Sequence, residues 1–101
     1  MSKLNGTWHM VISTYMGEQR STVELQADGT TLNGQVIDAG TGNSSPLFDG
    51  EVDGDKFSYK VTLKLPIGEL TFEMTGELVG EELKGKSANP MGEFEFTGTR
   101  A

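Results

Sequence analysis

Apolar and polar residues alternate along most of the chain, which predicts β-strands with one buried and one exposed face. The clearest run occupies every second position from residue 57 to residue 65, with Phe57, Tyr59, Val61, Leu63 and Leu65. The next run does the same with Leu70, Phe72, Met74, Gly76 and Leu78. A period of two residues is the spacing of side chains on one face of a strand. We therefore expect two long strands here.

Six further segments alternate in the same way, which gives eight predicted strands. Their inward positions are Trp8, Met10, Ile12; Val23, Leu25, Ala27; Leu32, Gly34, Val36; Phe48, Gly50, Val52; Leu83, Gly85, Ser87; and Phe94, Phe96, Gly98, Arg100. Short turn signals separate them, apart from a longer loop expected over residues 40–46. Connections this short permit only antiparallel neighbours. The expected fold is all-β, an antiparallel eight-stranded up-and-down meander.

A weak internal repeat predicts how this meander is arranged. Residues 48–57 align with residues 74–83, and residues 26–32 give a looser third copy. Each copy reads as a hairpin, so the turns at Gly29, Gly54 and Gly80 should gather at one end, which we call the floor. The first and last strands are then left to pair, which closes a barrel without free edges.

Five glycines, at positions 34, 50, 76, 85 and 98, fall on the inward phase near the floor. Missing side chains there would leave room for Trp8, whose place in the first strand puts it at that end. The same glycines would also permit tight barrel curvature. The two interpretations are compatible, and the sequence leaves both open.

Length and composition limit the domain organisation and the partners. The 101 residues suffice for one domain, over residues 1–101, with a single core. The chain has no cysteine, which removes disulfides and thiolate metal sites. A formal charge of −7 repels nucleic acid and anionic lipid, so neither is an expected partner.

No apolar run approaches the length of a membrane span or of a signal peptide's apolar segment. We therefore expect no membrane association and a cytoplasmic location. An exported mature domain would show the same features.

Gly6-Thr7-Trp8 near the start and Arg100 in the last strand resemble the signature of the calycin superfamily, which includes the lipocalins, fatty-acid-binding proteins and avidins. The resemblance implies a calycin-like barrel in which the tryptophan plugs one end and the arginine packs on it. Trp8 and Arg100 would then form a structural barrel floor.

The opening is most similar to that of the avidins, through Ala27-Asp28-Gly29 and the Leu-x-Gly of residues 32–34. Biotin binding is not carried over. The avidin pocket uses several tryptophans and this chain has one, while Met10 and Val36 stand where that pocket has an asparagine and a tyrosine. Biotin is therefore rejected as the ligand.

The sequence offers little support for catalysis or metal binding. His9, the single histidine, falls on the outward phase, where a surface role is expected. Asp53 and Asp55 flank one glycine, too short a segment for a calcium loop. We expect no metal and no cofactor, and the catalytic residues, if any, are unknown.

Tyr59, Ser87 and Arg100 are the polar residues on the predicted inward face, and each needs a partner there. Arg100 is expected on Trp8. Tyr59 and Ser87 could bond a ligand, the backbone or one another. The end opposite the floor, which we call the mouth, is unusually apolar for loops, and with these two hydroxyls it gives the candidate ligand-binding residues Tyr59, Ser87, Leu65, Ile67, Leu70, Phe72, Met91 and Phe94.

Three functions follow from this pattern. The first is a small-molecule-binding barrel that holds an apolar or aromatic molecule, oriented by Tyr59 or Ser87. The second is a homo-oligomeric structural or interaction domain with a filled interior. The third is a cofactor-free isomerase or lyase acting on an apolar substrate, which lacks a convincing acid and base pair. The first is preferred, and loops that simply cap the core are the plain alternative.

Overall fold

The structure of the protein, a computed structural model, describes residues 4–14, 17–38, 42–65, 68–89 and 92–101. These residues form strands and turns and contain no helix. The strands are β1 Gly6–Thr14, β2 Gly17–Asp28, β3 Thr31–Asp38, β4 Ser44–Pro46, β5 Phe48–Asp53, β6 Lys56–Leu65, β7 Gly68–Val79, β8 Glu82–Asn89 and β9 Gly92–Arg100.

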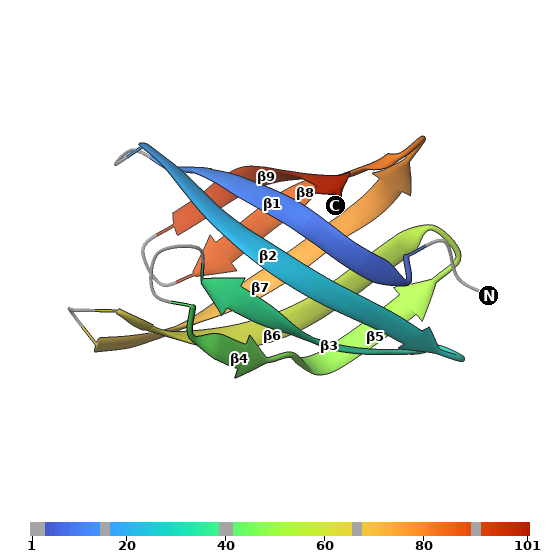
Figure 1. The fold of residues 1–101 in the computed structure, drawn as a ribbon, viewed down its shortest axis with the longest axis horizontal. Coiled ribbons are helices and arrows are strands. Elements are labelled where there is room, and N and C mark those ends of the chain that lie inside the picture. Colours follow the sequence, from blue (N-terminus) through green and yellow to red (C-terminus); the bar gives the residue numbers. More distant parts are fainter. Residues whose placement is uncertain (1–3, 15–16, 39–41, 66–67, 90–91) are drawn as a thin grey trace.

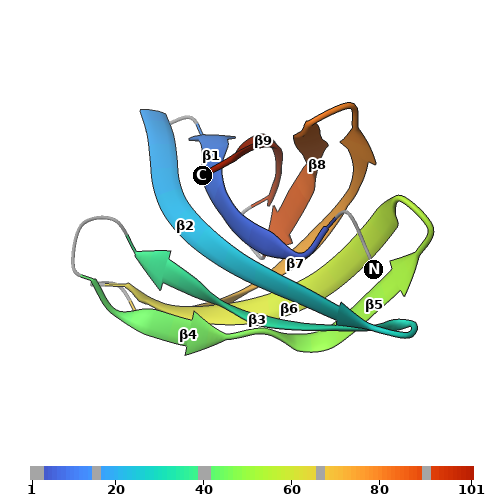
Figure 2. The same cartoon turned by 45° about the vertical axis from the view of Figure 1, so that its right-hand side comes forward.

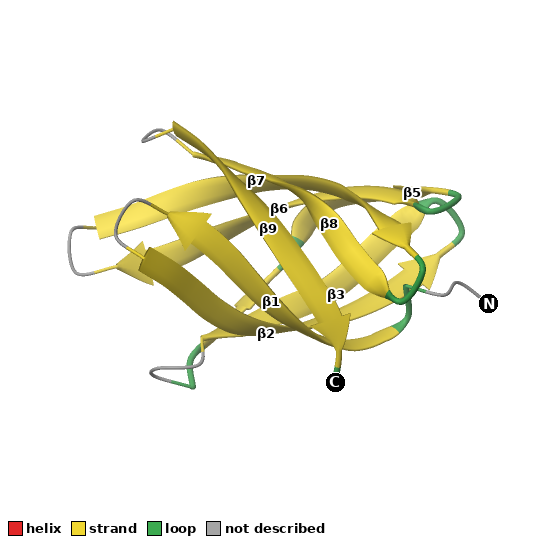
Figure 3. Cartoon of the chain, turned by 90° about the horizontal axis from the view of Figure 1, so that it is seen from above, coloured by secondary structure: helices red, strands yellow, loops and turns green. Residues whose placement is uncertain are grey.

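The strands form one antiparallel sheet that closes on itself (Figures 1 and 2). β1 pairs with β2 on one side and with β9 on the other, so the two ends of the chain meet. β2 also pairs with β3, while β4 and β5 together fill the place of one strand between β3 and β6. The expected eight-stranded up-and-down barrel is therefore confirmed, and Figure 3 shows it side-on as strands throughout.

The fourth strand differs from its prediction in two ways. Ser44–Pro46, expected within a loop, pair with β3 as β4. In β5, Phe48 and Glu51 are three positions apart while their β6 partners, Lys60 and Ser58, are two positions apart, which is a β-bulge at Asp49, with φ of 52°. The bulge moves the residues just before it to the face opposite the one that alternation predicts. Phe48, expected inside, is 42 % exposed, and Leu47 packs against the core in its place.

The floor forms where the repeat predicted it. The β2–β3, β5–β6 and β7–β8 connections are two-residue loops at the same end of the barrel (Figure 1). Each begins with a glycine of positive φ, at Gly29, Gly54 and Gly80. Two-residue hairpin loops require such a backbone conformation, which glycine adopts without steric cost. β1, β3, β6 and β8 end at the opposite end, the mouth.

Core side chains are buried toward the floor and in the centre, and several inward side chains nearer the mouth are half-buried. Phe57, Met74 and Phe96 are buried in its centre, and the ring centroids of Phe57 and Phe96 lie 6.4 Å apart. Along β7 the inward side chains change from buried Leu78 and Met74 to half-buried Phe72. Phe72 and Phe94 lie at the inward positions next to Met74 and Phe96 in their strands. The structure leaves both half-buried, because they lie nearer the mouth.

The inward glycines serve strand packing and core packing, not the seating of Trp8. A Cβ at Gly85 would lie 2.0 Å from the carbonyl oxygen of Thr75, and one at Gly50 would lie 2.0 Å from that of Leu32. At Gly98 the nearest atom is the sulfur of Met10, at 2.5 Å. None of the nearest atoms at the five positions belongs to Trp8. Barrel curvature is thus the better of the two interpretations.

Candidate functional site

The floor is closed by a tryptophan that the chain wraps from both ends. Trp8 has no exposed surface, and its Nε1 donates a hydrogen bond of 2.9 Å to the backbone oxygen of buried Leu4. The guanidinium carbon of Arg100 lies 4.2 Å from the Trp8 ring centroid. Nη1 of the same arginine donates to the backbone oxygen of Asn5 at 3.0 Å. Leu4, Trp8 and Arg100 therefore cover the floor end of the barrel.

Two hydroxyl-bearing side chains lie at one level inside the barrel. Tyr59 of β6 pairs with Met74 of β7, and Met74 pairs with Ser87 of β8. Ser87 pairs in turn with Phe94 of β9. Paired residues of antiparallel strands point to the same face. The four residues thus form one inward row across adjacent strands.

Neither hydroxyl in this row has a hydrogen-bond partner among the described residues. Tyr59 is 1 % exposed and Ser87 is fully buried, and both hydroxyl oxygens are shielded from solvent. Burial raises the pKa of the Tyr59 phenol above its ordinary value, because the phenolate would lose its hydration. Tyr59 is therefore a neutral group that is able to donate a hydrogen bond. The two do not bond one another, which answers one alternative left open by the sequence.

The mouth side of this row is lined by partly covered apolar side chains. Leu70 and Phe72 of β7 and Phe94 of β9 are half-buried although they share the inward phase of the core. Leu65, another candidate, is the last residue of β6, and its backbone pairs with Gly68. The candidates Ile67 and Met91 lie outside the described residues. Half-burial at inward positions means that the core side chains do not fully cover this end.

Sequence reasoning missed polar residues on the opposite wall. Ser21 of β2 pairs with inward Met10, and Ser45 of β4 pairs with inward Val36. Both serines are half-buried. Asn89 continues the inward phase of Ser87 in β8 and is also half-buried. Ser21 stands before the apolar run of its strand and Ser45 stands in the expected loop, so alternation alone gave no signal for either.

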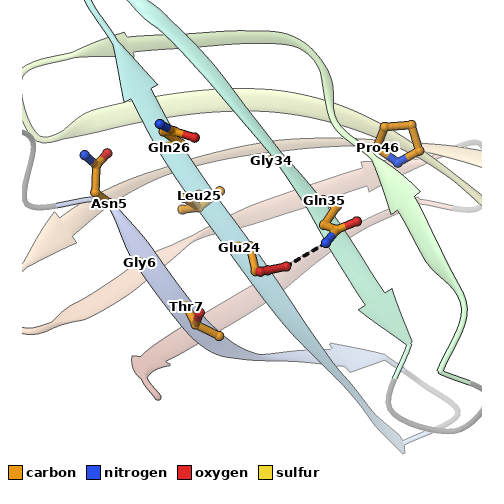
Figure 4. Close-up of a pocket in the computed structure, with 9 residues that line it drawn as sticks. All are labelled: Asn5, Gly6, Thr7, Glu24, Leu25, Gln26, Gly34, Gln35 and Pro46. Atoms are coloured by element: carbon orange, nitrogen blue, oxygen red, sulfur yellow. Dashed lines mark hydrogen bonds between the residues drawn. The ribbon is translucent and has the colours of Figure 1, made fainter.

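A shallow groove crosses the outer face of the barrel near the floor (Figure 4). Its volume is about 540 Å³, and an outward row across β1 to β4 forms its centre, with Thr7, Glu24, Gln35 and Pro46. Two hydrogen bonds lie within it: Gln35 Nε2 donates to Glu24 Oε1 at 2.6 Å, and Asn5 Oδ1 accepts from the backbone nitrogen of Ala27 at 2.7 Å. Among the described residues, no side-chain nitrogen or oxygen of this groove is both buried and without a partner.

The described residues hold no group of three or more His, Asp or Glu side chains placed to bind a metal ion. His9 is exposed on the outer face of β1. The same part of the chain has no helix long and apolar enough to cross a membrane.

Comparison with known proteins identifies the fold. No family model matches the chain. No curated protein matches it either. A solved structure described as a redesigned β-barrel superimposes with a TM-score of 0.72 at 17 % identity, covering 97 % of this chain and 91 % of the other. At this identity the likeness shows the architecture alone: the chain is an all-β, closed antiparallel barrel of eight strands in up-and-down order.

Proposed function

We propose that this barrel binds a small, mostly apolar molecule that enters at the mouth and takes hydrogen bonds from Tyr59 and Ser87. The observation that carries the proposal is the pair of buried hydroxyls without a partner. Leaving a buried polar group unpaired costs about 1–3 kcal/mol, so most buried hydroxyls in folded proteins are satisfied. A bound molecule would supply the missing partners.

The layout of the barrel supports entry at the mouth. Trp8 and Arg100 cover the floor, whereas Leu70, Phe72 and Phe94 remain half-buried at the opposite end. An eight-stranded barrel is just wide enough for its side chains or for one small ligand. The proposal includes a calycin-like use of the fold, with a tryptophan-closed floor and a ligand above it.

The direct test is binding of the neutral fluorescent probe N-phenyl-1-naphthylamine. We expect one probe per chain, with Leu70→Trp reducing affinity at least about tenfold by crowding the mouth. Val79→Trp is the matched control, since Val79 lies on the same strand beside the floor and is 47 % exposed. Probe binding that is equally weakened by both variants, or by neither, contradicts entry at the mouth.

The hydroxyls are tested separately in the free protein. Tyr59→Phe and Ser87→Ala each remove a group that has no protein partner, so the free energy of unfolding should stay constant or rise. Both variants should bind molecules that carry a hydrogen-bond acceptor more weakly than the wild type does. A loss of stability above about 1 kcal/mol in the free protein would mean that the hydroxyls serve the fold.

The homo-oligomer and the enzyme, the two alternative functions, predict different results in these measurements. A homo-oligomer with a filled interior predicts a molecular mass above that of one chain and no saturable probe binding. A cofactor-free isomerase or lyase predicts turnover of a bound apolar substrate that Tyr59→Phe abolishes, because the phenol is the buried titratable group in the row.

A further inference from the structure

We infer that the ligand is an uncharged molecule that carries a hydrogen-bond acceptor such as an ester, ketone or amide carbonyl, and that carboxylates and ammonium ions are excluded. This inference deepens the proposed function and rests on it. It follows from the kind of polar group that the barrel interior presents.

The interior offers no compensation for a ligand's charge. Among the described residues, no Lys, Arg, His, Asp or Glu side chain is buried, and Ser87 is the one polar residue in the buried set besides Tyr59. Arg100 is the one cation on the predicted inward face of the strands, and it lies over the Trp8 ring at the floor. Burying an unpaired charge costs far more than burying a neutral polar group. A charged head group would therefore be held at the rim or rejected.

The polar side chains that the structure describes at inward positions near Tyr59 are hydroxyls and an amide. Tyr59 and Ser87 are buried, and Ser21, Ser45 and Asn89 are half-buried. Each hydroxyl offers a donor and an acceptor, while a carbonyl oxygen accepts through two lone pairs. Because burial raises the pKa of Tyr59, the phenol stays protonated and donates. A neutral acceptor can take hydrogen bonds from the Tyr59 and Ser87 hydroxyls without needing a counter-ion.

Charge at the rim also opposes anions. Glu69 is exposed near the start of β7, and Glu93, near the start of β9, is exposed and paired with Lys86 at 3.5 Å. The chain as a whole carries a formal charge of −7. A carboxylate approaching the mouth of this acidic chain thus meets net negative charge before it meets an interior in which the described residues bury no cation.

The distance from Tyr59 and Ser87 to the mouth end of β7 limits the ligand to medium length. From Met74 to Leu70 the strand rises about 13 Å at about 3.3 Å per residue, and a tilt of roughly 40° leaves about 10 Å along the barrel axis. Below Met74, the side chains of Phe57, Phe96 and Met10 fill the interior. Medium-chain compounds of one length and different head groups are therefore suitable probes.

The experiment measures displacement of bound N-phenyl-1-naphthylamine at pH 7 by methyl octanoate, octanoate, octylamine and nonane. We expect methyl octanoate to compete at a concentration at least about tenfold lower than octanoate or octylamine, and several-fold lower than nonane. Tyr59→Phe should weaken the ester about three- to tenfold and leave nonane unchanged. Ser58→Ala, which removes a hydroxyl from the outer face of the same strand, is the control.

The outcomes separate the two levels of the proposal. Octanoate or octylamine competing as well as the ester overturns the exclusion of charge while leaving a binding barrel in place. If nonane and methyl octanoate displace the probe at equal concentrations, both in the wild type and in Tyr59→Phe, the role of the hydroxyls is overturned. No saturable binding of the probe or of any competitor by the folded wild type overturns the proposed function itself, and this inference with it. Ser87→Ala provides a second reading should Tyr59→Phe melt below the assay temperature.

Discussion

Arg100 and Trp8 face one another across paired strands, with the guanidinium carbon 4.2 Å from the ring centroid and Nη1 bonded to the backbone oxygen of Asn5. The contact joins residues 92 positions apart in the chain and holds the last strand against the first. It therefore bears directly on closure of the barrel.

Replacement of this arginine is expected to cost stability. Arg100→Ala removes the cation–π contact, the packing of the side-chain stem and the bond to Asn5, a loss of about 1 kcal/mol. For a domain of this size that lowers Tm by about 4–8 °C. Arg20→Ala is the control, because its ion pair with Glu18 is exposed and contributes little. Equal melting temperatures for the two variants, with unchanged Trp8 fluorescence, would disprove the role of the contact.

The centre of the core should respond much more strongly. Phe96 is 2 % exposed and packs against Phe57, so Phe96→Ala is expected to cost about 3–5 kcal/mol by creating a cavity. The control is Phe48→Ala, since Phe48 is 42 % exposed outside the bulge and should change stability by less than about 1 kcal/mol. Urea unfolding measures both. Similar costs for the two phenylalanines would show that the register of β9 or β5 is wrong.

Gly85 tests whether the inward glycines are required by close strand approach. Gly85→Ala would place a Cβ 2.0 Å from the Thr75 carbonyl oxygen and 2.9 Å from the Phe96 ring, and φ there is not positive. We expect Gly85→Ala to lower the free energy of unfolding by more than about 2 kcal/mol, through overpacking alone. Lys84→Ala, at an exposed neighbouring position, should be nearly neutral. A stable Gly85→Ala protein would favour the view that the glycines merely leave space.

Alkaline unfolding should report the burial of Tyr59. Its pKa is raised in the folded state by desolvation, while the unfolded chain ionises near 10. Above pH 10 the unfolded state binds fewer protons, so stability falls with rising pH, by up to about 1.4 kcal/mol per unit from this group. Tyr59→Phe should lack that component. Denaturant titrations of wild type and variant from pH 8 to 11.5 measure the difference, and parallel curves would mean that Tyr59 is accessible.

The sequence by itself determined the architecture of this protein. Alternation has the period of a strand, and the glycine turns after Asp28, Asp53 and Val79 allow nothing but antiparallel hairpins, so strand order followed from local physics. The same phase correctly placed Tyr59 and Ser87 in the interior.

The tertiary structure alone decided the features that depend on neighbouring strands. The bulge at Asp49 reverses the roles of Leu47 and Phe48, and its cause lies in the pairing with β6, which alternation does not encode. Ser21 and Ser45 face inward through pairing with Met10 and Val36, beyond the apolar runs that alternation detects. Whether Tyr59 and Ser87 bond one another was likewise undecided, because the partners of a hydroxyl are set by distances across strands, and here both oxygens are buried without a partner among the described residues.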